Sequence, residues 1–373
     1  MKTINVVGWD NGFNSEKIVI GESHQKKLVF PSVTVERSKG RKIDFKLNGK
    51  KFNEERMMIK HKGIEYSVGK KATNNAKTSF RRKLNKEKFK DLTEKIKLMS
   101  GMSALFPEEE EITIENLYIS HSLNTYNKYR EEIIKEYENK EFKYSIPTPN
   151  NGVKDVILNI KNVVPFPQGI SAYYDEILNY NGSLNKESEL VEKDGEGTIV
   201  PTESRYLLVD IGENTTDAFI AEGQDVISDT TTSLSTGMRD VFDRIKNDFS
   251  EEISLLNLEQ AMIDTLNENG NVKDNKITMK ANYEKLDITD NVKNALKKVA
   301  EDIFNQTQSE WDRYSGTEDF AFTCGGGALF LGNYINDLYK EMGEIKHIVV
   351  SDPQFANANG LYKIGVLNNK NTI

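Results

Sequence analysis

Two polar turns, about half a chain apart, hold residue types that can bind phosphate groups and a metal ion. In the first turn, Gly12 lets the backbone approach a bound group because it has no Cβ, and successive backbone N–H groups can cradle phosphate oxygens. Lys17 can place a positive charge on those oxygens, and Asp10 offers a carboxylate to hydrated Mg²⁺. The turn predicts a phosphate and magnesium site, with an ordinary Asn-Gly hairpin turn as the alternative. Its sequence is Asp10-Asn11-Gly12-Phe13-Asn14-Ser15-Glu16-Lys17.

The second turn repeats this pattern in the other half of the chain. Asp210 ends an apolar run and precedes Gly212, and two threonines add hydroxyl donors. A polar hairpin without a ligand is again the alternative. The sequence of this turn is Asp210-Ile211-Gly212-Glu213-Asn214-Thr215-Thr216-Asp217.

Two further segments carry residues with a predicted role. Three glycines follow the apolar run 320–323 and would let a flat ligand lie against the backbone, although a strand-to-helix turn needs no ligand. Residues 164–173 contain Gln168 between prolines and a helical pattern, and a glutamine there could orient an attacking water. Cys324, the single cysteine, is predicted to be a small buried residue.

The elements that must position these residues can be read from hydrophobic patterns. Short β-branched runs predict strands on both sides of each turn, at 4–7 and 18–20 and at 206–209 and 218–221. Helical spacing is found at 238–249 and 292–304, and a last helix is expected at 357–366. Residues 77–103 also read as helical, and 181–204 read as a loop or linker. Two similar hairpins half a chain apart suggest two lobes with a weak internal duplication.

Composition limits the functional classes that the chain can belong to. Its 373 residues suffice for two or more domains, and its net charge of -8 argues against nucleic-acid binding over the whole surface. One cysteine excludes an intrachain disulfide and a cysteine-based metal cluster. The sequence shows no signal peptide and no apolar run of the roughly 20 residues that a membrane span needs, so a cytoplasmic location is expected.

The order and spacing of these motifs resemble those of the actin superfamily, which also includes DnaK-type chaperones and sugar kinases. Asp10-x-Gly12 with Lys17 resembles its first phosphate loop, Asp210-x-Gly212 with the threonines that follow resembles the second, and Gly325-Gly326-Gly327 resembles its adenosine loop. Residues 164–173 and 356–360 resemble the two connections between the lobes. The five elements span nearly the whole chain.

Within the superfamily, the chain most resembles bacterial ParM/StbA-type plasmid-segregation actin-like proteins. The resemblance rests on Phe30-Pro31-Ser32, Tyr66-Ser67-Val68-Gly69 and Pro167-Gln168-Gly169. One departure is Ser122-Leu123-Asn124-Thr125-Tyr126, where relatives usually have Gly-Leu-Pro.

The resemblance implies an α/β, actin-like (ribonuclease-H-like) fold with a nucleotide cleft between two related lobes, each built on a mixed five-stranded sheet. Lobe I would cover 1–204, with a small subdomain at about 35–69. Lobe II would cover 205–348, with a small subdomain at about 237–300. Residues 349–373 would return to lobe I.

The resemblance also implies the ligands, which are ATP or ADP, with GTP as the alternative nucleotide, and Mg²⁺. Asp10 and Asp210 would hold the metal through water, and Gln168 would position the attacking water with help from Asp210. The residues expected to contact the nucleotide are Asp10, Asn11, Gly12, Phe13, Asn14, Lys17, Gly212, Glu213, Asn214, Thr215, Thr216, Gly237, Gly325, Gly326, Gly327 and Ala328.

The function that the resemblance implies is an ATPase that polymerises with itself and segregates plasmid or phage DNA, with slow hydrolysis driving filament turnover. DNA would be bound only indirectly, through an adaptor protein of the ParR type, and no membrane partner is expected. The alternative is a non-polymerising member, either a small-molecule kinase, for which Asp217 is a conceivable catalytic aspartate, or a chaperone-type ATPase. The basic run 77–90 is predicted to be a solvated helix face, with a DNA or partner surface as the alternative.

Overall fold

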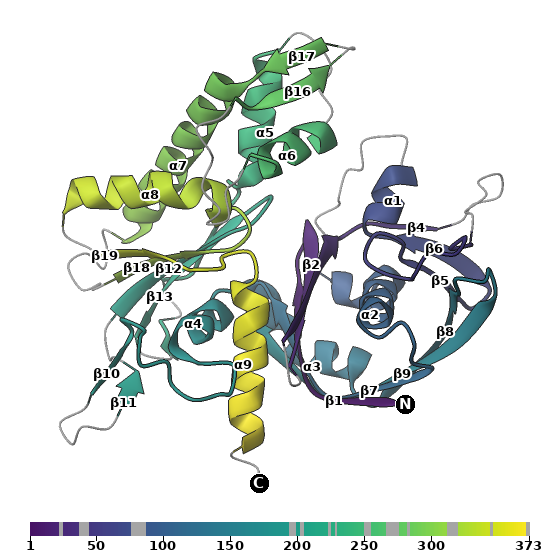
Figure 1. Ribbon diagram of the computed structural model, residues 1–373. Helices are drawn as coiled ribbons and strands as arrows, with labels where there is room; N and C mark the ends of the chain where they lie inside the picture. The colour runs from purple at the N-terminus through teal and green to yellow at the C-terminus, as the bar shows by residue number, and fades with distance from the viewer. Residues whose placement is uncertain are drawn as a thin grey trace. The chain divides into compact units, whose positions relative to one another are not determined.

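The chain divides into two units, shown together in the computed structural model of Figure 1. The first unit comprises Met1–Ser183 and Ala358–Ile373, and the second comprises Leu184–Asn357. The structure describes residues 1–21, 25–36, 45–75, 87–193, 199–201, 205–222, 225–227, 230–249, 255–265, 276–281, 284–311, 320–343 and 346–370.

The described part of the first unit is built on one mixed sheet, with the strand order β3-β2-β1-β7-β9-β8-β5-β6-β4. The central strands β1, β7 and β9 are parallel to one another, and their outer neighbours are antiparallel. β9 is 15 residues long, and its residues 157–167 pair with β7 while its residues 153–160 pair with β8. The strands are β1 (Lys2–Asn11), β2 (Ser15–Ile20), β3 (Lys26–Pro31), β4 (Thr34–Glu36), β5 (Met58–His61), β6 (Ile64–Val68), β7 (Glu111–His121), β8 (Lys140–Pro147) and β9 (Val153–Pro167).

The sheet of the first unit curls around helix α2 (Leu92–Leu105), which contacts β3 at one end of the strand order and β4 at the other (Figure 1). Every residue from Ile96 to Ser103 is buried, as expected for a helix enclosed on all sides. A Cβ at Gly101 would lie 2.5 Å from Ile18 Cδ1, so helix and sheet are in close contact. The other helices of this unit are α1 (Lys70–Asn75), η1 (Lys88–Lys90), α3 (Leu123–Tyr137), α4 (Ile170–Ile177) and all but the first two residues of α9 (Ala356–Lys370).

The helix predicted over 77–103 is wrong at 87–91, where the described part of this range begins. Residues 76–86 lie outside the described part, η1 is a short 3₁₀ turn, and Asp91 has an extended backbone that separates this turn from α2. The helical reading failed here because a periodic run of lysines and apolar residues does not reveal where the backbone leaves the α region.

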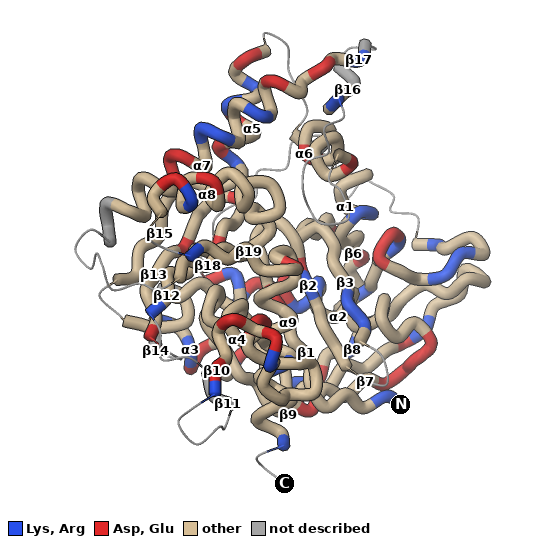
Figure 2. Tube along the Cα trace, turned by 60° about the vertical axis from the view of Figure 1, so that its left-hand side comes forward, with Lys and Arg blue, Asp and Glu red and all other residues tan. Residues whose placement is uncertain are grey.

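The described part of the second unit holds a second mixed sheet, with the strand order β14-β13-β12-β18-β19 and with β15 also paired to β13. Its core lies between this sheet and the apolar sides of α5, α7 and α8. Acidic and basic residues both occur along α7 (Figure 2), and Arg244 on α5 forms an ion pair with Asp302 on α7. The strands are β12 (Arg205–Ile211), β13 (Thr216–Glu222), β14 (Asp225–Val226), β15 (Thr232–Leu234), β18 (Phe320–Cys324) and β19 (Lys346–Val349).

The helices predicted from 3.6-residue spacing in this unit are confirmed as α5 and α7. The loop predicted over 181–204 is wrong in part, since it contains the strand pair β10–β11. The remaining elements are β10 (Val191–Lys193), β11 (Ile199–Pro201), α5 (Met238–Asn247), α6 (Leu255–Ile263), β16 (Thr278–Ala281), β17 (Glu284–Asp287), α7 (Thr289–Trp311) and α8 (Ala328–Met342).

The two sheets share a five-stranded core, which confirms the predicted internal duplication. The same sequence of parallel and antiparallel pairings occurs in both units. It follows the strand order β3-β2-β1-β7-β9 in the first unit and β14-β13-β12-β18-β19 in the second. The prediction of five strands in each lobe is too low, because β8, β5, β6 and β4 extend the first sheet and β15 extends the second. Asp10 pairs with Lys17 in the first hairpin, and Asp210 pairs with Asp217 at the same register in the second.

Candidate functional site

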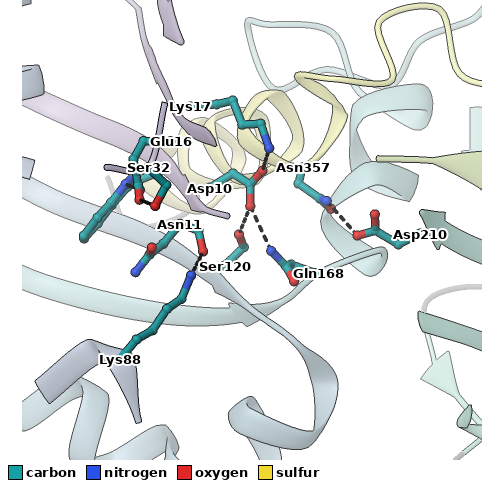
Figure 3. Close-up of polar contacts among 11 residues, drawn as sticks. Asp10, Asn11, Glu16, Lys17, Ser32, Lys88, Ser120, Gln168, Asp210 and Asn357 are labelled. Atoms are coloured by element: carbon teal, nitrogen blue, oxygen red, sulfur yellow. Dashed lines mark hydrogen bonds and ion pairs between the residues drawn. The ribbon is translucent and has the colours of Figure 1, made fainter. Parts of the chain in front are cut away.

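The candidate site of the first unit is centred on the Asp10 carboxylate, which is 2 % exposed. Lys17 Nζ donates to Oδ2 at 2.9 Å, while Ser120 Oγ and Gln168 Nε2 donate to Oδ1 at 2.7 and 2.9 Å (Figure 3). Each oxygen of this buried carboxylate therefore accepts at least one hydrogen bond, which offsets the cost of removing the charge from water.

These partners come from three strands that end at the same edge of the sheet. The β1–β2 hairpin pairs Asp10 with Lys17, and β7, parallel to β1, brings Ser120 level with Asp10. β9 ends at Pro167, and the next backbone N–H, of Gln168, donates to His121 O on β7 at 2.8 Å. The carboxyl ends of β1, β7 and β9 thus collect the polar side chains at one place.

Asp10 remains ionised at neutral pH in this setting. Burial alone would raise the pKa of Asp10, but the Lys17 ammonium and the hydrogen bonds from Lys17, Ser120 and Gln168 have the opposite and larger effect, so its pKa lies below the ordinary value. An ionised carboxylate is the form that a divalent cation requires.

The backbone of the first turn comes close to the start of β2 at Gly12. A Cβ there would lie 2.5 Å from Ser15 O and 3.2 Å from Lys17 Nζ, so no side chain fits. Lys88 Nζ donates to Asn11 O and lies 4.2 Å from the centre of the Phe13 ring. Asn11 is 1 % exposed, and its side chain forms no hydrogen bond within the described residues.

A buried ionic network supports the same hairpin from the α2 side. Glu16 is fully buried and accepts hydrogen bonds from Trp9 Nε1, Ser32 Oγ and Lys97 Nζ at 2.7 to 2.8 Å. Lys97 also pairs with Glu94 at 2.5 Å. Because Lys97 and Glu94 lie on α2, this network fixes β1 and β2 against the helix that the sheet encloses.

The candidate site of the second unit is centred on Asp210, near the end of β12. Its Oδ2 accepts a hydrogen bond from Asn357 Nδ2 at 2.9 Å (Figure 3), and both side chains are buried. Gly325 has φ +86°, and a Cβ there would lie 2.2 Å from Asp210 Oδ1. The glycine that follows β18 is thus required by its backbone conformation and by the carboxylate beside it.

The turn after Asp210 is joined to the start of α5. Gly212 N donates to Thr215 O, and the N–H groups of Met238 and Arg239 donate to the carbonyls of Gly212 and Glu213. Gly237 precedes α5 and its N–H donates to Asp240 Oδ2 at 2.9 Å. The predicted nucleotide contact of Gly237 would compete with the hydrogen bond that its N–H already donates to Asp240.

Thr216 is fully buried, and its hydroxyl donates to Thr236 O at 2.8 Å, so this hydroxyl serves the loop itself. In the glycine run, Gly327 N donates to Ile211 O at 2.9 Å and Ala328 N to Gly325 O at 3.1 Å. A Cβ at Gly326 would meet no atom within 4 Å, so open space adjoins this position. Gly326 is the member of the run that has room for a flat ligand.

Each unit therefore brings together its own share of the predicted residues. Asp10, Gly12, Lys17 and Gln168 lie together in the first unit, while in the second the Asp210 turn lies with Gly237 and with Gly325, Gly327 and Ala328. Cys324 is buried, as predicted. Asp217 accepts a hydrogen bond from Ser233 Oγ at 2.6 Å, and burial raises its pKa although this bond acts in the opposite direction.

Three residues that contact the site were not predicted, namely Ser120, Lys88 and Asn357. Ser120 ends an apolar strand, as Asp10 does, and this shared position was the one available signal. Lys88 belonged to the run read as a solvated helix face, but its contacts with Asn11 and Phe13 contradict that reading at this position, since Lys88 lies in η1 and its side chain points into the unit. The rest of that run, up to residue 86, lies outside the described part.

The described residues contain neither a cluster of metal-ligating side chains nor a membrane-spanning helix. Within those ranges, no three His, Cys, Asp or Glu side chains lie together as a metal-binding group. None of the helices that the structure describes combines the length and the apolar composition needed to span a membrane.

Comparison with known families covers both units. Residues 8–170 match the family model of the N-terminal domain of actin-like proteins, and residues 208–337 match that of the C-terminal domain of the MreB-like archaeal actin homologue. A comparison with curated protein sequences gave no match.

Solved structures of actin homologues are similar over nearly the whole chain. Actin-like protein Alp7A has a TM-score of 0.80 at 15 % identity, covering 99 % of this chain and 98 % of its own. The archaeal actin homologue Ta0583, in complex with ADP, has a TM-score of 0.66 at 17 % identity, covering 97 % and 99 %. ParM from a 15-stranded filament of Clostridium botulinum has a TM-score of 0.67 at 20 % identity, covering 98 % and 99 %.

At these identities the structural likeness shows the fold, and it confirms the predicted actin-like α/β architecture with two related domains. The family models match the two units in the order in which the two aspartate turns occur. The chain belongs to the actin superfamily.

Proposed function

We propose that this chain binds ATP with Mg²⁺, hydrolyses it slowly, and polymerises with itself in an ATP-dependent manner. The main observation in support of this proposal is that both units contain the same arrangement of an aspartate in a β-hairpin. In each unit an aspartate ends the first strand of a hairpin and accepts a buried hydrogen bond, at the sequence positions of the two phosphate loops of the actin superfamily.

The residues present fit a nucleotide and a magnesium ion. Asp10 and Asp210 offer carboxylate oxygens, which Mg²⁺ prefers and often binds through its own waters. Lys17 brings an ammonium group to the first turn, and Gly326 adjoins open space that a flat adenine or ribose could fill. The archaeal homologue Ta0583 was crystallised with ADP, which supports a nucleotide as the ligand of this fold.

Hydrolysis would depend on positioning more than on a strong base. Gln168 donates its amide N–H to Asp10, which fixes the plane of the amide and leaves the amide oxygen to accept a hydrogen bond from an attacking water. Lys17 would stabilise negative charge that develops on the phosphates. When bound, Mg²⁺ supplies further charge neutralisation at the phosphates. An amide cannot act as a base at neutral pH, so basal turnover should be slow.

The biological proposal is a cytoplasmic filament that segregates plasmid or phage DNA through an adaptor protein of the ParR type. ParM of Clostridium botulinum forms a filament with the same fold, which supports self-association here. The net charge of -8 favours indirect attachment to DNA, because phosphate backbones attract basic surfaces.

Calorimetric titration of the full chain with ATP and ADP, with and without Mg²⁺, together with phosphate release, tests the nucleotide part of the proposal. The expected result is binding that Mg²⁺ strengthens, followed by slow release of phosphate. Absence of binding for every nucleotide, or transfer of phosphate to a sugar instead of water, would contradict it.

A further inference from the structure

Asn357 and Asp210 form a buried polar pair whose purpose the proposed function leaves open. Asn357 lies in the first turn of α9, is 4 % exposed, and donates from Nδ2 to Asp210 Oδ2 at 2.9 Å. The two residues are 147 positions apart in the sequence. A hydrogen bond between buried groups this distant in sequence fixes the carboxylate to an element outside its own hairpin.

The other oxygen of the Asp210 carboxylate is also confined. A Cβ at Gly325 would lie 2.2 Å from Oδ1, so the backbone of the glycine run closes on this side. Rotation of the carboxylate is thus limited by a donor on Oδ2 and by backbone near Oδ1. Such confinement is what a carboxylate needs in order to present one oxygen to a hydrated cation without losing further conformational entropy on binding.

The chemistry of the donor suits that role. At the position that Lys17 occupies in the first hairpin, the second hairpin has Asp217. An amide orients a carboxylate and carries no charge, so this hydrogen bond does not neutralise Asp210. In metal sites, groups that hydrogen-bond a ligand carboxylate in this way affect metal affinity without touching the metal.

We propose that Asn357 is a positioning residue for Asp210, which sets the affinity of the nucleotide site for Mg²⁺. The inference rests on the proposed function, because it assumes that Asp210 faces the metal of a bound nucleotide. It gives a role in the site to Asn357, which the sequence analysis placed only in the segment 356–360 that resembles a connection between lobes.

The same helix provides a matched control. Asn359 lies two positions further along α9, is 2 % exposed, and donates from Nδ2 to Asp175 Oδ2 at 3.1 Å. Asp175 lies on α4 and also forms an ion pair with Lys363 at 2.6 Å. Both asparagines thus hold a buried carboxylate through one amide hydrogen bond, but Asp175 is not in a phosphate turn.

The experiment compares Asn357→Leu with Asn359→Leu in the full chain. Stability is measured by urea denaturation, and ATP affinity by titration at a series of Mg²⁺ concentrations and in EDTA. The quantity compared is the Mg²⁺ concentration at which half of the Mg²⁺-dependent gain in ATP affinity is reached. Asn357→Leu is expected to raise this concentration by about tenfold and to leave the ATP affinity in EDTA unchanged. Asn359→Leu is expected to lose about as much stability as Asn357→Leu. Its ATP binding is expected to depend on Mg²⁺ as that of the wild type does.

The outcomes separate the inference from the function on which it rests. If the wild type does not bind ATP more tightly with Mg²⁺, the proposed function fails. If the wild type does so and the two leucine variants have the same Mg²⁺ dependence, the positioning role of Asn357 alone is wrong. Should Asn357→Leu fail to fold, Asn357→Gln keeps the amide but displaces it by one methylene. A shifted Mg²⁺ dependence of this variant would support the role, and an unchanged one would overturn it.

Discussion

At the scale of the residue, Gln168 uses one amide group for two tasks. Its N–H donates to Asp10, and its oxygen is the proposed acceptor for the attacking water. Gln168→Ala should reduce kcat by about 10²-fold, because positioning of the water is lost, while ATP affinity changes little. Steady-state phosphate release and ATP titration measure the two effects separately.

Ser120→Ala is the matched control, since Ser120 donates to the same oxygen of Asp10 but offers no group to the water. Its kcat should fall much less than that of Gln168→Ala. Equal losses of affinity and turnover in Gln168→Ala would count against the role given to this residue.

A second residue-scale prediction concerns His121, which is buried beside the first turn and edge-on to the Phe89 ring. Burial, with a smaller effect of Lys88, lowers the pKa of His121 to about 3. The unfolded chain binds a proton at this residue near pH 6.5 and the folded chain does not, so the free energy of unfolding should fall as the pH drops below about 6.5.

Between pH 6 and 4.5, His121→Gln should weaken this decline by up to about 1.4 kcal/mol per pH unit, the effect of one proton. Urea denaturation across that range, on the variant and the wild type, measures both slopes. Identical slopes would show that the histidine is not kept neutral by the fold.

The residue scale is also where prediction from sequence was most uneven. Asp10 and Lys17 are seven positions apart on paired strands, so a local motif identified both. Ser120 lies 110 positions from Asp10, and Asn357 lies 147 from Asp210. Such partners meet only through strand order and helix packing, which a local pattern does not encode.

At the scale of the element, α9 is held against α4 and β1 by close backbone contacts. A Cβ at Gly360 would lie 1.6 Å from Ser171 O on α4, and one at Gly8 would lie 2.4 Å from Ala358 O. Gly360→Ala should therefore lower the free energy of unfolding by about 2 kcal/mol or more, because backbone must move to admit the methyl group.

Gly326→Ala is the control for that prediction, because a Cβ there meets no atom within 4 Å. Its stability should stay within about 0.5 kcal/mol of the wild type, while the proposed nucleotide contact would be weakened. A Gly360→Ala protein as stable as the Gly326→Ala protein in urea denaturation would contradict the packing of α9 on α4.

The elements themselves were predicted where apolar runs were short and bounded by turns. The hairpins around Asp10 and Asp210 and the helices α5 and α7 follow from such patterns. The start of α2 and the pair β10–β11 did not, because their polar composition does not distinguish strand, turn and helix. The four strands that extend the first sheet join it through β8, which pairs with residues 153–160 of β9. This pairing leaves residues 157–167 of β9 to pair with β7 on the other edge.

At the scale of the whole molecule, the two units repeat one five-stranded topology with an aspartate at the same register. The units differ at the position that is Lys17 in one and Asp217 in the other, so the two turns carry different charges. Only a ligand that interacts differently with two conformations can shift the balance between them. In the proposed function ATP is that ligand, and the filament-competent conformation is the one that it favours.

High-speed pelleting of the purified chain with ATP·Mg²⁺, with ADP·Mg²⁺ and without nucleotide tests this central claim most directly. Abundant pelleting is expected with ATP·Mg²⁺ alone, with filaments visible in negative stain. A chain that hydrolyses ATP yet stays in the supernatant at high concentration would contradict the polymerising function.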